Sequence, residues 1–297
     1  RRDLLDPEQS DEIKSASASL LKTLAQAGVA SADPDRWLGL RRESISEPLI
    51  PDGEDIYLSP SSLQNFVDCG LKWFLEKSGA QDGDSSAQLL GVAIHALAAL
   101  IMKEPDLTAE AAIEKLHKAW GIVDQNVGWY KDAQRESASQ MLRRFFAWES
   151  ANDRTLIDAE REFMYNVGRA IVKGEVDRLE ESADGTALHI VDLKTGKSIA
   201  TKVETEEHLQ LRAYQLAILH DGFNKENEPR ITEITKSGGA ELLFLSKDTK
   251  SVDSQKQLPI DREATEAQIA EIAEGMAAAT FEARANKRCT TCKVAHI

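Results

Sequence analysis

The sequence has few cysteines, no long apolar run and no excess of basic residues. Only three of its 297 residues are cysteine, and an odd number does not fit a secreted domain held together by disulfides. No apolar run reaches the roughly 18 residues that a membrane-spanning helix needs, and the chain does not open with a secretory signal. We therefore expect a cytoplasmic protein with no membrane partner.

Positive charge is also in the minority. The chain has 36 Lys and Arg against 50 Asp and Glu, a formal net charge of −14. Domains that bind nucleic acids are usually basic, so this balance by itself argues against such a partner. A metal-dependent nuclease, however, gathers carboxylates in its site, and the bound cations reverse the local field. The acidic composition therefore does not exclude a nuclease.

The spacing of polar and apolar residues predicts a helical segment followed by one larger domain. Residues 1–56 are polar and helix-forming, and we expect them to be a helical connector before a domain over 57–297. In that domain the apolar spacing predicts helices over 60–77, 89–103, 107–120, 132–150, 206–220 and 261–285. It predicts strands over 156–167, 170–180, 186–194 and 241–246. This order predicts an α/β fold, with a central mixed β-sheet flanked by helices.

Two of the predicted strands carry the residues that suggest chemistry. An Asp-Gly turn joins them as a hairpin, which can bring Asp177 beside Asp192, and Lys194 shares a face with Asp192. Two carboxylates repel each other unless a cation holds them, and oxygen ligands, with the Leu193 carbonyl as one more, suit Mg²⁺ or Mn²⁺. A lysine there can orient water and offset charge on phosphorus. The layout is typical of a hydrolytic phosphodiesterase.

Four further residues strengthen this interpretation, although each also has an ordinary explanation. His95 interrupts an apolar helix and is either a core histidine or a neutral metal ligand. Gln210 and Tyr214 are four residues apart and share a helix face, as in any amphipathic helix, but both can hydrogen-bond phosphate or the lysine. Glu160 in the preceding strand is either an extra carboxylate ligand or a solvated charge. The D-L-K tripeptide at 192–194 alone would also suit a solvated sheet face.

In order and spacing, these residues resemble the RecB-like branch of the PD-(D/E)xK nuclease superfamily. The matching segments are G-V-A-I-H ending at His95, E-R-E-F from Glu160, G-E-V-D ending at Asp177, D-L-K from Asp192 and Q-L-R-A-Y from Gln210. The resemblance implies a restriction-endonuclease-like core and a divalent-metal nuclease acting on single-stranded DNA or DNA ends. It also implies that the matching His and two Asp bind metal, that the matching Lys is catalytic, and that the Gln/Tyr helix supports the site.

The cysteines extend the resemblance. Some members hold a 4Fe–4S cluster with one Cys before the nuclease core and three after it. Cys69, Cys289 and Cys292 match the first three ligands, and the fourth is expected at the position after Ile297. Zinc held by the three cysteines and His296 is an alternative, and so are three unligated thiols.

The resemblance is nearest to actinobacterial AdnAB-type helicase-nucleases, whose subunits join a UvrD-like motor to a C-terminal nuclease. It implies three partners: DNA, a helicase motor in the same polypeptide and a second helicase-nuclease subunit. The implied role is DNA-end resection in double-strand-break repair, in the bacterial cytoplasm near the nucleoid. The alternative is a catalytically silent module of the same fold that binds DNA or a partner subunit.

Two smaller predictions concern phosphate. The segment ending G-K-S at 196–198 looks like part of a Walker A loop, but Val191 stands where that motif requires glycine, so we do not expect ATP binding here. Candidate contacts to the DNA backbone, each also explicable as a solvated charge, are Lys72, Arg178, Lys197 and Lys202. No base-reading element stands out, so cutting is expected to be independent of sequence.

Overall fold

The computed structural model describes residues 2–6, 9–37, 46–80, 86–123, 129–196, 198–225, 228–246, 253–286, 289–290, 292 and 294. The chain divides into two compact units, Arg1–Glu47 and Pro48–Ile297. The first unit contains the helices α1 (Arg2–Leu5) and α2 (Asp11–Gln26) and two short 3-10 turns. Within it Trp37 is buried, and its indole N–H donates to the Ser31 carbonyl at 2.9 Å.

The second unit contains a six-stranded sheet and the helices around it. Its described helices are α3 (Pro60–Asp68), α4 (Gly70–Lys77), α5 (Ser86–Ala99), α6 (Ala109–Val123), α7 (Trp129–Ala151), α8 (Lys202–Glu206), α9 (Leu209–Leu219) and α10 (Arg262–Ala277). Its described strands are β1 (Ile56–Leu58), β2 (Thr155–Val167), β3 (Ala170–Glu181), β4 (Leu188–Lys194), β5 (Ser237–Phe244) and β6 (Asp253–Gln257). The predicted α/β class with a central mixed sheet is confirmed.

The strand β3 is the centre of this sheet because it pairs with three others. Its whole length pairs antiparallel with β2. On its other edge, residues 170–172 pair parallel with β1 and residues 178–181 pair antiparallel with β4. Residues 173–177 therefore lie between the two pairings, where neither β1 nor β4 continues the ladder. The sheet continues from β4 to a parallel β5 and an antiparallel β6.

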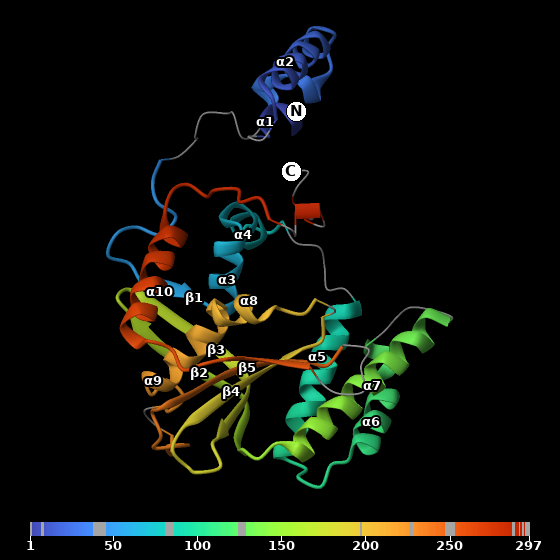
Figure 1. The fold of residues 1–297 in the computed structure, drawn as a ribbon, viewed down its shortest axis with the longest axis vertical. Helices are drawn as coiled ribbons and strands as arrows, with labels where there is room; N and C mark the ends of the chain where they lie inside the picture. The colour runs from blue at the N-terminus through green and yellow to red at the C-terminus, as the bar shows by residue number, and fades with distance from the viewer. Residues whose placement is uncertain are drawn as a thin grey trace. The chain divides into compact units, whose positions relative to one another are not determined.

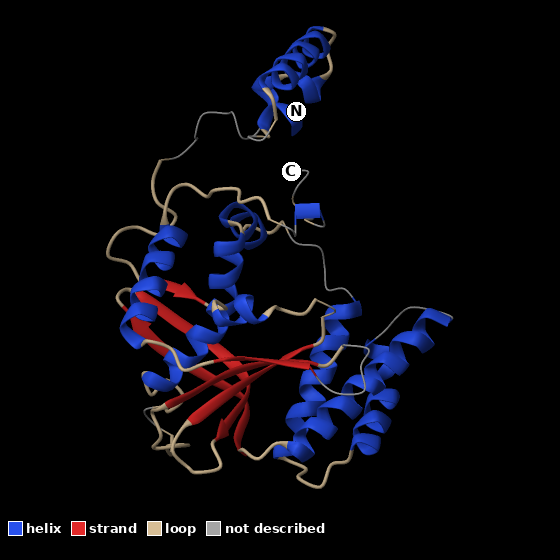
Figure 2. Ribbon diagram, in the orientation of Figure 1, coloured by secondary structure: helices blue, strands red, loops and turns tan. Residues whose placement is uncertain are grey.

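Helices cover both faces of the sheet (Figures 1 and 2). On one face α5, α6 and α7 form a core with the side chains of Val191, Leu193, Leu243 and Leu245. On the other face α3, α9 and α10 form a larger core that includes Ile190, Leu242 and Phe244. Side chains that alternate along β4 and β5 thus enter different cores, which is why both strands are apolar almost throughout.

Several predicted elements end where long-range contacts replace the local pattern. The helix predicted over 60–77 breaks at Cys69, whose φ of −166° is extended. There the Leu71 N–H donates to the Glu282 carbonyl, 3.0 Å away, from a distant segment. That same segment ends the last helix at Ala277 rather than at 285. After Ala277 the chain runs along α3 and α4 instead of continuing the helix. There the Phe281 ring stacks on the Phe74 ring, with 4.5 Å between their centroids.

Other boundaries were wrong because their signals are short. The helix predicted over 206–220 is α9, which begins at Leu209, and the short helix α8 before it was missed. The strand predicted from 241 begins at Ser237. The strands β1 and β6 were missed, one because it has three residues and the other because its sequence, DSQKQ, is polar. Polar edge strands carry no alternation for a pattern to detect.

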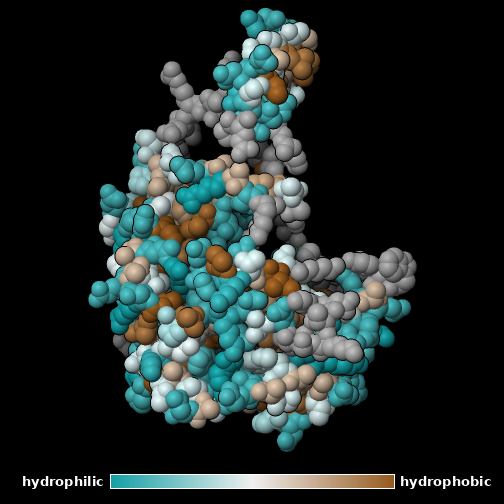
Figure 3. Space-filling view, in the orientation of Figure 1, coloured by the Kyte–Doolittle hydropathy of each residue, from teal (hydrophilic) through white to brown (hydrophobic). Residues whose placement is uncertain are grey.

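The surface of the second unit is largely polar. Figure 3 shows hydrophilic side chains over most of the visible face, with hydrophobic ones in several small groups. The most exposed large hydrophobic residues of this unit lie in separate places, on α5, β2 and α8 and just after β6: Val92, Met164, Val203 and Leu258. Scattered residues of this kind are normal and do not by themselves mark an interface. None of the described helices is both long and apolar enough to cross a membrane.

Candidate active site

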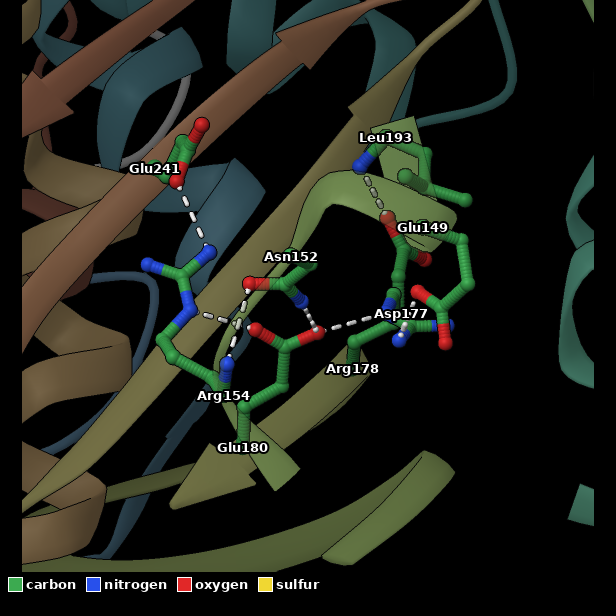
Figure 4. A network of polar contacts seen from close by, with 8 residues as sticks. All are labelled: Glu149, Asn152, Arg154, Asp177, Arg178, Glu180, Leu193 and Glu241. Carbon is green, nitrogen blue, oxygen red and sulfur yellow. Dashed lines mark hydrogen bonds and ion pairs between the residues drawn. The ribbon is translucent and has the colours of Figure 1, made fainter. Parts of the chain in front are cut away.

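Asp177 and Asp192 lie where the β3–β4 ladder stops. The last pair of that ladder is Arg178 with Val191, so the two aspartates are the next residue on each strand. The Leu193 backbone N–H donates to Asp177 Oδ2 at 2.6 Å, which replaces the missing ladder bond (Figure 4). The hairpin therefore brings the two aspartates to the same place, at the end of the stretch of β3 that β1 and β4 leave uncovered.

His95 reaches this place from α5. Its Nδ1 lies 2.9 Å from Asp177 Oδ1. The helix can approach closely because residue 91 is glycine: a Cβ at Gly91 would lie 3.1 Å from the Thr195 hydroxyl at the end of β4. Burial lowers the pKa of His95, but the hydrogen bond and negative charge of Asp177 outweigh it, so this pKa is raised. The imidazole inside the apolar helix is thus beside a carboxylate rather than enclosed in a core.

Asp192 is held from the opposite side by three polar groups. Lys194 Nζ lies 2.7 Å from Asp192 Oδ2, and Gln210 Nε2 donates to Oδ1 at 3.0 Å. The Tyr214 hydroxyl donates to the same Oδ1 at 3.4 Å and accepts from Gln210 Nε2 at 2.7 Å. Lys194 Nζ also donates to Gln210 Oε1 at 3.3 Å. The face of α9 formed by Gln210 and Tyr214 therefore positions both the carboxylate and the ammonium.

The electrostatics of this group follow from its burial. Burial raises the pKa of the Asp192 carboxyl; the Lys194 ammonium opposes this and the Asp177 carboxylate adds to it, and the pKa stays above its ordinary value. Burial, followed by the charge of Asp192, raises the pKa of Tyr214, so its hydroxyl remains a neutral donor. Burial therefore disfavours the charged form of the Asp192 carboxyl, and the Lys194 ammonium offsets this only in part.

The donor set fits a hard divalent cation. Asp192 Oδ2 is buried and satisfies the geometry of no hydrogen bond; Lys194 Nζ lies 2.7 Å from it as an ion-pair partner. Carboxylate oxygens and an imidazole are ordinary ligands of Mg²⁺ and Mn²⁺. In the part of the chain that the structure describes, no three His, Cys, Asp or Glu side chains already converge as ligands of one metal ion. The residues present therefore suit a cation, with His95 and Asp177 now bonded to each other.

Glu160 is near this site but does not join it. The β2–β3 register places it across from Asp177, yet its φ of 51° interrupts the ladder and its side chain is exposed. Among the described residues it makes no hydrogen bond or ion pair with the other predicted site residues. Glu175 was not among the predicted residues; it is exposed on β3, and partial desolvation and the nearby charges of Glu160 and Asp177 raise its pKa. The signal available for it was its position two residues before Asp177 on the same strand.

The three cysteines lie around one small pocket of about 30 Å³. Cys69, at the end of α3, lines it together with Cys289 and Cys292 from the C-terminal segment. All three thiols are free. They are gathered as the resemblance implies but do not form a complete ligand set, so a 4Fe–4S cluster stays a prediction. His296 lies outside the described residues, and with it the zinc alternative.

Of the candidate phosphate contacts, Arg178 was wrong. Its side chain is buried and bound to two carboxylates, Glu149 Oε2 at 2.5 Å and Glu180 Oε1 at 2.9 Å (Figure 4). Lys72 pairs with Glu76 on its own helix. Lys202 pairs with Glu206, with 81% of its side chain exposed. Lys197 lies outside the described residues.

The raised pKa of Asp192 predicts that the wild-type site costs stability in the absence of metal. A carboxyl whose pKa is higher in the folded protein opposes folding once the pH exceeds its unfolded value. We expect Asp192→Asn, which keeps an acceptor for Gln210 and Tyr214, to raise the free energy of unfolding at pH 7 by roughly 0.5–2 kcal/mol. Thermal unfolding in EDTA between pH 4 and 8 measures this, and the gain should shrink toward low pH. A variant less stable than the wild type at pH 7 would contradict the pKa argument.

The family model and the curated relatives that match this chain all describe nucleases. The family model described as the PD-(D/E)XK nuclease superfamily matches residues 57–297. An ATP-dependent helicase/deoxyribonuclease subunit of Lactococcus lactis subsp. cremoris strain SK11 is 25% identical over 241 residues, covering 71% of this chain and 22% of that protein. The exonuclease/helicase subunit RexB of strain MG1363 is 30% identical over 141 residues, covering 43% of this chain and 13% of that protein.

The chain thus spans less than a quarter of the length of these two relatives. Among solved structures, a candidate exonuclease from Eubacterium rectale is similar in fold, with a TM-score of 0.46 and 13% sequence identity. The similarity covers 82% of this chain and 89% of that one.

Proposed function

The chain belongs to the PD-(D/E)XK nuclease superfamily, and we propose that it hydrolyses phosphodiester bonds of DNA with a divalent cation at the site of Asp177 and Asp192. The observation that carries this proposal is the buried Asp192 carboxylate, with one oxygen lacking a hydrogen-bond donor and Lys194 Nζ 2.7 Å away. A decayed site would not be expected to retain a buried charge that opposes folding. Members of this superfamily generally use divalent metal ions.

The cation would be held by His95, Asp177 and Asp192, with the Leu193 carbonyl as a further predicted ligand. Glu160 is exposed and not bonded to this group, so it would have to turn toward the cation to join them. A bound Mg²⁺ or Mn²⁺ would supply positive charge to the phosphate and make water easier to deprotonate. The His95–Asp177 hydrogen bond holds two of these side chains together, and Lys194, Gln210 and Tyr214 hold Asp192. Asp177 is additionally held by the Leu193 N–H.

The remaining chemistry comes from the chain itself. Lys194 has 31% of its side chain exposed, so its ammonium can meet a phosphate oxygen or an attacking water from the solvent side. Asp192 and Gln210 fix the ammonium at one position, and fixed donors stabilise developing charge better than mobile ones. Gln210 also bonds Tyr214, so the two α9 residues position the lysine and the carboxylate together.

The finer features of the function are proposals supported by the relatives' names. Helicase/deoxyribonuclease and exonuclease/helicase subunits support a nuclease that works with a helicase motor in the same polypeptide and with a second subunit. We further propose single-stranded DNA or DNA ends as the substrate, end resection as the process and the bacterial cytoplasm as the location; of these, only the action on ends has support in a relative's name, through the word exonuclease. The narrower likeness to actinobacterial enzymes stays a prediction, as does the cluster, for which the present cysteines form only part of a ligand set.

The direct test is cleavage of end-labelled single-stranded and duplex DNA by the purified chain with Mg²⁺, Mn²⁺ or EDTA. We expect cutting of single strands in either metal, none in EDTA, and loss of cutting in Asp192→Asn, which removes the carboxylate charge but keeps the fold. Titration calorimetry with Mn²⁺ separates the alternatives. No binding at millimolar Mn²⁺ and no cutting would instead favour a silent module that binds DNA or a partner subunit. Cutting in EDTA, or cutting that survives Asp192→Asn, would refute the assigned site.

A further inference from the structure

We infer that Gln64 is a positioning residue for this site, because it holds the end of α9 that carries Gln210. This inference rests on the proposed nuclease function. The Leu209 backbone N–H donates to Gln64 Oε1 at 3.0 Å. The other end of the same amide, Nε2, donates to Asp68 Oδ1 at 2.9 Å. Both ends of the Gln64 amide are therefore used, and its orientation is determined.

The N-terminus of α9 needs this contact. The first N–H groups of a helix have no partner inside the helix, and a side chain at the N-cap usually satisfies one of them. The N-cap of α9 is His208, which makes no side-chain capping bond. Leu209 is buried, so its N–H cannot rely on water. Gln64 supplies the acceptor from α3, a helix 145 residues away in the sequence.

The residue after Leu209 is Gln210, which bonds Asp192 Oδ1 and accepts from Lys194 Nζ. A loosened first turn of α9 would therefore move the group that aligns the carboxylate with the ammonium. Such a change misplaces reacting groups without removing any of them, so it should lower kcat and leave KM for DNA nearly unchanged. Misplacement of about 1 Å can cost up to about a hundredfold in rate.

Asp68 connects the same contact to the cysteine pocket. It lines that pocket, and its backbone carbonyl accepts from Asn286 Nδ2 at 2.9 Å. Cys69 follows it as the residue where α3 ends. Gln64 thus joins the active-site end of α9 to the wall of the cysteine pocket, so the two sites share one hydrogen-bonded link.

The experiment exchanges the amide and the carboxylate between positions 64 and 68. Gln64→Ala removes both hydrogen bonds, and we expect kcat for single-stranded DNA cleavage to fall about tenfold to a hundredfold. In the double variant Gln64→Glu with Asp68→Asn, the new carboxylate accepts from Leu209 N–H and from the new amide. This double variant should recover most of the lost kcat. Asp68→Asn alone keeps an acceptor for Gln64 and should stay close to the wild type.

A matched control is available on another side of α9. Gln268 of α10 accepts a bond of 2.7 Å from Arg212 Nη1, so Gln268→Ala also removes a glutamine that holds α9. This contact does not involve the first N–H groups of the helix. We expect Gln268→Ala to keep kcat within about twofold of the wild type, well below the cost of misplacing reacting groups.

A second measurement does not depend on activity. Hydrogen exchange of residues 208–211 in metal-free protein should become faster in Gln64→Ala and return to normal in the double variant. If exchange is unchanged, or if it rises while kcat stays the same, Gln64 is not a positioning residue. If the wild type fails to cleave any DNA, the proposed function fails, while exchange still reports whether Gln64 holds α9.

Discussion

Replacing Lys194 by Met is expected to lower kcat for DNA cleavage by a factor on the order of 10²–10³, the usual cost of removing one fixed charge-stabilising donor. Lys194 Nζ is the one cationic group that the structure places against Asp192, at 2.7 Å, within the described chain. Methionine keeps the length of the side chain and removes only the charge and the donors. Single-turnover cleavage at saturating Mg²⁺ measures the chemical step without product release.

The same replacement should have a smaller effect on folding. The lysine now lowers the pKa of the buried Asp192 carboxyl, so its loss raises that pKa further. Without metal, Lys194→Met should therefore be less stable than the wild type at neutral pH and approach it as the pH falls. Lys118→Met is the matched control, since that lysine is exposed and pairs with Glu114 on α6. If both methionine variants cleave equally well, Lys194 is not part of the catalytic group.

Replacing Glu180 by Ala is expected to lower the free energy of unfolding by about 3–5 kcal/mol, the usual cost of breaking a buried ion pair from one side. Glu180 is fully buried. It accepts from Arg154 Nε at 2.7 Å, from Arg178 Nε at 2.9 Å and from Asn152 Nδ2 at 3.1 Å (Figure 4). Its loss leaves the buried guanidinium of Arg178 and the partly buried one of Arg154 with one carboxylate fewer between them.

Urea unfolding monitored by circular dichroism measures this loss. The neighbouring carboxylates, Glu149 on Arg178 and Glu241 on Arg154, reduce the damage but cannot replace a charge that both arginines share. Glu162→Ala is the control, because that glutamate is exposed on β2 and its ion pair in the described part of the chain is with Lys225 at the surface. We expect no measurable change for the control. Equal stability of the two variants would show that the buried network is not a stabilising element.

The alternation of apolar residues along the chain was sufficient to predict the strands in the middle of the sheet. The strands β2, β3 and β4 lie within one or two residues of their predicted bounds, because they follow one another as antiparallel partners joined by turns. The strands β1 and β6 were not predictable in this way. β1 is too short for a pattern and is stabilised by pairing with β3, far away in the sequence. β6 pairs with its neighbour β5, but its polar sequence carries no alternation of apolar residues.

The residues of the site were likewise predictable only in part. The types and spacing of Asp192, Lys194, Gln210 and Tyr214 could be recognised locally, since strand and helix periodicity places them on shared faces. Arg178 could not be judged locally. A basic residue next to a predicted catalytic aspartate looks the same whether it faces solvent or lies in a buried network, and here it is buried. Only packing against α7 distinguishes the two.

By itself, the sequence determined the α/β class, the hairpin and the chemical identity of the site residues, because these depend on periodicity and side-chain type. The tertiary structure decided which of those residues meet. It brought His95 within 2.9 Å of Asp177, left Glu160 outside the group and placed Gln64 under the first turn of α9. These outcomes depend on how helices pack across the sheet, and contacts between residues so distant in sequence have no local signal.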